Sequence, residues 1–153
     1  MTCRGLNCGS AKSAIRMRSG KMKLIHCRVV TPEGLYREMD TPIVNIDTTD
    51  GQRGILPDHM PLVTMLKIGR MTTEENGQRE EYAVAGGLFY FRDNRAEIMT
   101  DAIENKRDID AERAEAAKAR AERRIGSNNP NYDLQRAEIA LQKALNRLNV
   151  KNH

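Results

Sequence analysis

The basic residues of the last third of the chain have types and spacing that could do chemistry. Arg113 and Arg120 are seven residues apart, which places them on one face of a helix, and Lys143 and Arg147 are four apart further along. If the two segments form antiparallel helices, three or four cations converge, as a triphosphate requires. Asp110 could accept a hydrogen bond from a ligand's amino group or order the start of the first helix. The spacing alone would therefore allow a triphosphate to bind at these cations, without a reaction.

The same segment has a plainer interpretation as a solvated, charged helix face. Residues 107–124 contain six basic and five acidic residues, with i,i+4 pairs such as Lys118 with Glu122. A second function to weigh is a nucleic-acid-binding module that uses the Arg-rich helices. A phosphate-binding stripe should be clearly basic, and Tyr132 is the only aromatic residue there that could stack on bases. The near-neutral balance argues against nucleic acid as a partner.

Catalytic constellations are missing from the sequence. There is no G-x-S-x-G or H-E-x-x-H motif, and Gly20-Lys21 is followed by Met22 rather than by the Ser or Thr of a phosphate-binding loop. His59 has three interpretations: a turn residue whose ring bonds a neighbouring carbonyl, a catalytic or metal-binding group, or an interface residue on an exposed loop. The first and third are favoured because no Cys pair or second His accompanies it. A small enzyme built on a β-sandwich is the least favoured function.

Charge and cysteine content indicate in which compartment the protein works and whether it can insert in a membrane. The chain of 153 residues has a net charge of +4, but residues 1–21 hold five basic residues and no acid, so the remainder has 20 basic and 21 acidic residues. A basic leader of this kind is transit-like, or is not native and follows from an upstream start, and we expect it to be disordered. Three cysteines favour a reducing compartment, and no apolar run is long enough to insert in a membrane.

The elements that must position the candidate residues fall into two regions. Short alternating runs at 24–30, 35–39, 43–48, 63–71, 81–85, 88–92 and 96–100 predict an antiparallel β-sandwich. Asp50-Gly51 and Asn76-Gly77 predict hairpin turns, and Gly86-Gly87 predicts a bulge or a close backbone approach.

Beyond residue 106 the pattern is helical. Residues 107–124 contain six alanines and no Gly or Pro, with Asp110 as the cap, and a second helix is predicted from 131 to 150 with Pro130 in its first turn. The facing side chains of the first helix are Ala114, Ala117, Ala121 and Ile125. Because most of them are alanines, the hairpin should be marginal alone and free to detach. The expected fold is α+β, with a leader at 1–21, a sandwich at 22–106 and a helical hairpin at 107–153.

Two motifs carry a resemblance to a known family. Residues 51–62 read G-Q-R-G-I-L-P-D-H-M-P-L, and residues 109–114 read I-D-A-E-R-A. The first resembles the G-x-x-G-I-[LY]-P-x-H-x-P-L motif of the epsilon subunit of F-type ATP synthase. The second resembles the I-D-x-x-R-A motif of bacterial epsilon subunits that bind ATP. The resemblance runs from Met22 to the end of the chain.

The resemblance implies a non-catalytic part of the central rotor stalk, peripheral on the cytoplasmic side of a bacterial cell membrane, which couples proton flow to ATP synthesis. Its partners would be the gamma subunit, the membrane ring of subunit c, and the alpha and beta subunits of the catalytic head. The loop that faces the ring and gamma would be Gly51, Gln52, Arg53, Asp58 and His59.

The resemblance also implies a regulatory hairpin. In the family, the two helices switch between a compact hairpin and an extended form that blocks ATP hydrolysis. No cofactor is required, but ATP would be a regulatory ligand, held by Glu104, Ile109, Asp110, Arg113, Arg120, Lys143 and Arg147. Lys143 stands where strong ATP binders have arginine, and it keeps the charge without the planar fork of a guanidinium.

Overall fold

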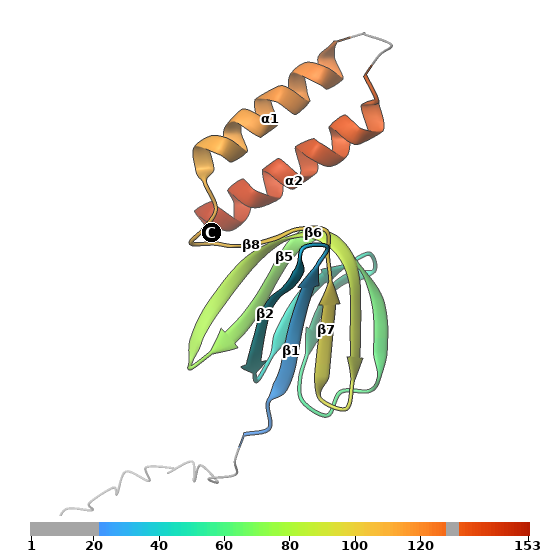
Figure 1. Ribbon diagram of the computed structural model, residues 1–153, viewed down its shortest axis with the longest axis vertical. Coiled ribbons are helices and arrows are strands. Elements are labelled where there is room, and N and C mark those ends of the chain that lie inside the picture. The colour runs from blue at the N-terminus through green and yellow to red at the C-terminus, as the bar shows by residue number, and fades with distance from the viewer. Residues whose placement is uncertain (1–21, 128–131) are drawn as a thin grey trace, which may run out of the picture.

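The computed structural model describes residues 22–127 and 132–153 as a β domain followed by a helical hairpin (Figure 1). The predicted leader, Pro130 and the predicted start of the second helix at 131 lie outside the described residues. The strands are β1 (Ile25–Thr31), β2 (Gly34–Thr41), β3 (Val44–Thr48), β4 (Gly51–Ile55), β5 (Leu62–Glu75), β6 (Gln78–Arg92), β7 (Arg95–Met99) and β8 (Ile103–Asn105).

The eight strands form one sheet in the order β2-β1-β7-β6-β5-β3-β4, with β8 beside β6. The pairing is antiparallel except between β1 and β7, which run parallel from the His26–Arg95 pair to the Val30–Met99 pair. The predicted sandwich is therefore mostly rather than wholly antiparallel. The exception follows from the topology, since β1 and β7 are joined through the rest of the domain and not by a hairpin.

The sheet closes into two layers because β5 and β6 arch over the end of the domain that carries the helices (Figure 1). Gly86 and Gly87 lie at the bend of β6, with φ of 94° and 136°. A Cβ at Gly87 would overlap the carbonyl oxygen of Met99, which confirms the predicted close approach. The two strands expected at 81–85 and 88–92 are thus one bent strand, whose first half pairs with β8 and second half with β7.

Alternating side chains of both layers fill the core. Tyr82, Phe89 and Phe91 of β6 are fully buried among aliphatic residues of the other strands. Arg37 of β2 donates to the Tyr82 hydroxyl at 2.9 Å and to Glu75 Oε2 at 2.7 Å, and so joins β2 to the far ends of β5 and β6. Burial raises the pKa of Cys27 to about 12, so this thiol is a packing residue in the native state.

Two turn predictions have different outcomes. Asn76 and Gly77 have φ of 52° and 75° and connect β5 to β6, as an Asn-Gly hairpin turn requires. Gly51 lies one residue after the turn between β3 and β4, where it pairs with Thr48. The segment 51–62, which carries the first family motif, therefore begins as the short edge strand β4. This strand was not predicted because its sequence, G-Q-R-G-I, does not alternate between apolar and polar residues. A strand at the edge of a sheet can be this polar because one side of it faces solvent.

The helices are α1 (Ala111–Gly126) and α2 (Leu134–Asn152). Asp110 caps α1 as predicted, and its Oδ1 accepts from the Arg113 N–H at 3.1 Å. Among the described residues, α2 begins at Leu134, later than the sequence predicted, because Asp133 is its cap and accepts from the Arg136 N–H at 3.1 Å. Neither helix, among the residues described, is both long and apolar enough to cross a membrane.

Small side chains form the seam between the helices. Ala114 and Ala121 of α1 and Ala137 and Ala144 of α2 are buried. Only α2 packs on the arch of β5 and β6 (Figure 1). A seam of methyl groups buries little area, at roughly 25 cal/mol per Å² of apolar surface, so contacts with the sandwich matter for holding the hairpin in place.

Candidate functional site

An open hollow of about 490 Å³ lies where α1, α2 and β8 meet. Three guanidinium groups and three carboxylates surround it, and two alanines form its floor. Its lining residues are Glu104, Asp108, Asp110, Arg113, Ala114, Ala117, Arg120 and Arg147. It brings together five of the seven residues predicted to hold ATP.

The α1 side of the hollow carries two exposed guanidiniums on one helix face, as the spacing of Arg113 and Arg120 predicted. Within the described part of α1, the only ion pair joins Lys118 to Glu122 at 3.8 Å. Arg113 and Arg120 thus have no carboxylate partner among the described residues. Two cations held in one direction by a capped helix suit an anionic ligand.

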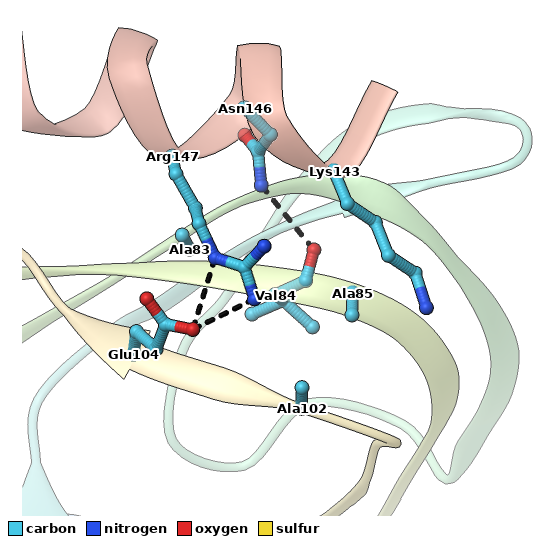
Figure 2. A pocket seen from close by; sticks show the side chains of 8 residues that line it. All are labelled: Ala83, Val84, Ala85, Ala102, Glu104, Lys143, Asn146 and Arg147. Carbon is cyan, nitrogen blue, oxygen red and sulfur yellow. Dashed lines mark hydrogen bonds and ion pairs between the residues drawn. The ribbon is translucent and has the colours of Figure 1, made fainter. Parts of the chain in front are cut away.

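The α2 side of the hollow is tied to the sandwich. Arg147 Nε and Nη2 donate to Glu104 Oε1 at 2.9 and 2.7 Å, and both side chains are about one third exposed (29% and 37%) (Figure 2). This pair joins α2 to β8 across the base of the hollow. A phosphate entering the hollow would meet an Arg147 that is already oriented.

Two predicted residues lie outside the hollow. Lys143 lines a smaller, adjacent cavity above Ala83, Ala85 and Ala102 (Figure 2). Ile109 is 2% exposed and packs with Ala83 and Val150, so its side chain anchors the start of α1 in the core. Sequence reasoning missed Asp108 at the rim, because no spacing rule singled it out.

The charged side chains of the hollow are suited to binding a ligand. Asp110 is engaged as the helix cap, and Glu104 is engaged by Arg147. Among the described residues, no group of three His, Cys, Asp or Glu side chains could hold a metal ion. The hollow therefore offers charge and shape to an anion, with Asp108 and Asp110 at one end to accept hydrogen bonds from a polar group.

The five predicted interface residues lie elsewhere. Gly51, Gln52 and Arg53 are in the edge strand β4, and Asp58 and His59 are in the loop between β4 and β5. The Asp58 carboxylate accepts from Lys23 Nζ at 2.5 Å. Because Lys23 lies two residues before β1, this loop lies at the end of the domain away from the helices (Figure 1).

Contacts shape the Asp58-His59 loop. Asp58 has φ of 62°, and its N–H donates to Asn94 Oδ1 at 2.6 Å. Hydrogen bonds from Lys23 and then from Asn94 lower the pKa of the exposed Asp58 carboxyl. The His59 Nδ1 lies 2.8 Å from the Met60 carbonyl oxygen, and the ring stands edge-on to Phe91 at 5.9 Å. His59 thus has the turn role that the sequence allowed.

An apolar row on the outer face of one layer was missed by sequence reasoning. Register pairs join Met65 to Leu88, Leu88 to Met99, Met99 to Val30, and Val30 to Leu35, across five strands. Met65, Met99 and Leu35 are 57%, 41% and 51% exposed. The alternation within β5 was a signal, but the row appears only once the strands are aligned.

The outer face of the other layer is polar. Asn45, Thr72 and Glu81 form a register row there, and Glu81 lies within 4 Å of Arg70, Arg79, Lys106 and His153. The asymmetry between the two faces marks the apolar row as a surface suited to another protein.

A mostly antiparallel β-sandwich followed by a helical hairpin, with an open hollow and one apolar outer face, is typical of a small binding protein or of a subunit of a larger complex. The family model described as ATP synthase, Delta/Epsilon chain, beta-sandwich domain matches residues 24–106, and the model of the long alpha-helix domain of the same chain matches residues 107–152. The chain belongs to the ATP synthase delta/epsilon family and is a non-catalytic subunit of that enzyme, which confirms the resemblance to the epsilon subunit.

Two bacterial relatives support the same family assignment. The chain is 43% identical to the ATP synthase epsilon chain of Bacillus velezensis over 129 residues, covering 84% of this chain and 98% of the relative. It is 41% identical to that of Ligilactobacillus salivarius over 134 residues, covering 85% and 96%.

Two solved structures share the fold. A chain of the Euglena gracilis mitochondrial ATP synthase superposes with a TM-score of 0.74 at 23% identity, covering 90% of this chain and 87% of that one. A chain of the Tetrahymena thermophila mitochondrial ATP synthase central stalk and c-ring superposes with a TM-score of 0.53 at 15% identity, covering 84% and 93%.

Proposed function

We propose that this chain works in the central stalk of a proton-translocating F-type ATP synthase, where its sandwich links the gamma subunit to the ring of subunit c. The observation that carries this proposal is the apolar row from Met65 to Leu35, which gives a family member a large surface for a permanent partner. The complex would be peripheral on the cytoplasmic side of a bacterial membrane. Residues 22–106 would form the coupling module and 107–153 the regulatory one.

The gamma subunit fits the apolar row. Five adjacent strands present apolar side chains, and a neighbouring row carries the Arg28–Glu38 pair at 3.3 Å. An apolar core with a charged rim is the usual composition of a stable protein interface. The ring of subunit c fits the opposite end from the helices, where Asp58 and His59 stand on a fixed loop, with Gln52 and Arg53 on the adjacent edge strand.

Substitution of Met65 by Arg tests the gamma interface. Met65→Arg places a charge at the β5 end of the row, and we expect gamma to be lost from the purified pair, with affinity at least 100-fold weaker, or roughly 3 kcal/mol. Gln78→Arg, at the exposed first residue of β6, is the matched control and should bind normally. Normal co-purification of gamma with a folded Met65→Arg protein would show that the row is not the interface.

The helical hairpin would regulate hydrolysis. The hollow offers Arg113, Arg120 and Arg147 to the phosphates of ATP, and Asp108 and Asp110 to its base. Because the lining comes from α1, α2 and β8, a ligand that fills it favours the compact hairpin by its differential affinity. The extended hairpin would then reach the alpha and beta subunits and block ATP hydrolysis.

Removal of residues 107–153 tests the regulatory module. The two helices contact the sandwich through one face of α2, so the sandwich core is intact without them. We expect a complex with the truncated chain to assemble, to pump protons on ATP addition, and to hydrolyse ATP at or above the full-length rate. Loss of assembly or of proton pumping would show that the hairpin is structural.

A further inference from the structure

Asn146 is a polar side chain of α2 that forms hydrogen bonds with the arch of β5 and β6. Its Nδ2 donates to the carbonyl oxygen of Gly69 at 2.8 Å. It also donates to the carbonyl oxygen of Val84 at 3.3 Å (Figure 2). A primary amide carries two N–H groups, so one side chain can serve both acceptors. The two contacts join a helix to strands that are 77 and 62 residues earlier in the chain.

The two acceptors are fixed by the bend in the sheet. Gly69 of β5 and Val84 of β6 face each other in the register of the pair. A Cβ at Gly69 would lie 2.6 Å from Asp47 Cβ and Oδ2, so the backbone here is packed directly against β3. The Asp47 Oδ2 also accepts from the Arg70 N–H at 2.9 Å. The Asn146 side chain therefore donates to two main-chain carbonyl groups whose positions are fixed by packing.

The other contacts between α2 and the sandwich are few or exposed. Among buried residues, the apolar contact joins Val150 to Ile109 and Ala83. Lys151 Nζ donates to the carbonyl oxygens of Lys106 and Arg107 at 3.3 and 3.5 Å. Because the residue after Asn146 is Arg147, the rotation of α2 that satisfies Asn146 also directs Arg147 to Glu104.

We propose that Asn146 is a positioning residue that makes the sandwich part of the nucleotide site. It docks α2 so that Arg147 and Glu104 complete the hollow, and the docked hairpin binds nucleotide more tightly than the undocked one. This inference rests on the proposed ATP binding. Since coupling is reciprocal, ATP also strengthens docking.

Two leucine variants test the inference. Asn146→Leu keeps the size and improves helix propensity but removes both N–H donors. Asn149→Leu makes the same change at an exposed position of α2 and is the matched control. Docking is measured in the full chain by energy transfer between dyes on Gln142→Cys and Gln78→Cys, with Cys3 and Cys8 replaced by serine, and binding by calorimetry with ATP.

Asn146→Leu should lengthen the dye separation and weaken ATP binding about tenfold, as a fall of the docked population to about one tenth requires. Saturating ATP should restore the wild-type separation, and Asn149→Leu should change neither quantity. An unchanged separation, or a lengthened one with unchanged ATP affinity, overturns the inference. Absence of ATP heat from the wild-type protein overturns the proposed nucleotide binding itself, and the coupling with it.

Discussion

Gly87→Ala should destabilise the sandwich by about 3–5 kcal/mol, within the range of severe single substitutions. Gly87 has φ of 136°, and an added Cβ would overlap the main-chain carbonyl of Met99 and crowd Thr100 Cα at 2.9 Å. Main chain cannot move aside as a flexible side chain can. The substitution therefore forces β6 away from the end of β7 and the residue that follows it.

Gly34→Ala is the matched control. Gly34 has φ of 126°, but nothing lies within 4 Å of its added Cβ, so only backbone strain of about 1–2 kcal/mol is expected. Urea unfolding of both variants, followed by circular dichroism, separates strain from overlap. Equal unfolding free energies for the two variants would contradict the close approach at Gly87.

The bend at Gly86-Gly87 also explains which strands the sequence could predict. Asn76-Gly77, Gly86-Gly87 and the Asp110 cap were found because each is a local conformational requirement of the chain. β4 and β8 were missed because short strands of five and three residues owe their pairing to neighbours and carry no period of their own. The continuity of β6 through two glycines likewise depends on β8 and β7.

In the candidate site too, features set by local helix geometry could be predicted, whereas features set by packing between elements could not. Helical periodicity placed Arg113 and Arg120 on one face, since it needs only the geometry of α1. The rotation of α2 against the sandwich decides that Arg147 lines the hollow while Lys143 lines the next cavity, and no spacing within α2 could reveal this. Asn146 was invisible for the same reason, because its acceptors are main-chain carbonyls of β5 and β6.

Arg113→Ala should weaken binding of ATP by about 1.5–3 kcal/mol, or roughly 10- to 150-fold, the usual range for hydrogen bonds to a charged group. Arg113 lines the hollow, is exposed, and has no carboxylate partner within the described residues, so its guanidinium is free to donate to a phosphate. The backbone N–H of Arg113 donates to the Asp110 carboxylate, and an alanine at this position keeps that hydrogen bond. Stability of the hairpin should therefore hardly change.

The measurement is calorimetry with ATP on the isolated full chain, with Arg136→Ala as the control. Arg136 lies in the first turn of α2, outside the hollow, and its 3.2 Å contact with Asp133 is an exposed i,i+3 pair. Loss of the same positive charge there leaves the lining intact, so a general electrostatic effect would weaken both variants alike. A specific phosphate contact weakens Arg113→Ala alone. Identical ATP binding by the wild type and Arg113→Ala would return these arginines to the interpretation of a solvated helix face, because a guanidinium that contributes nothing to affinity is not a ligand.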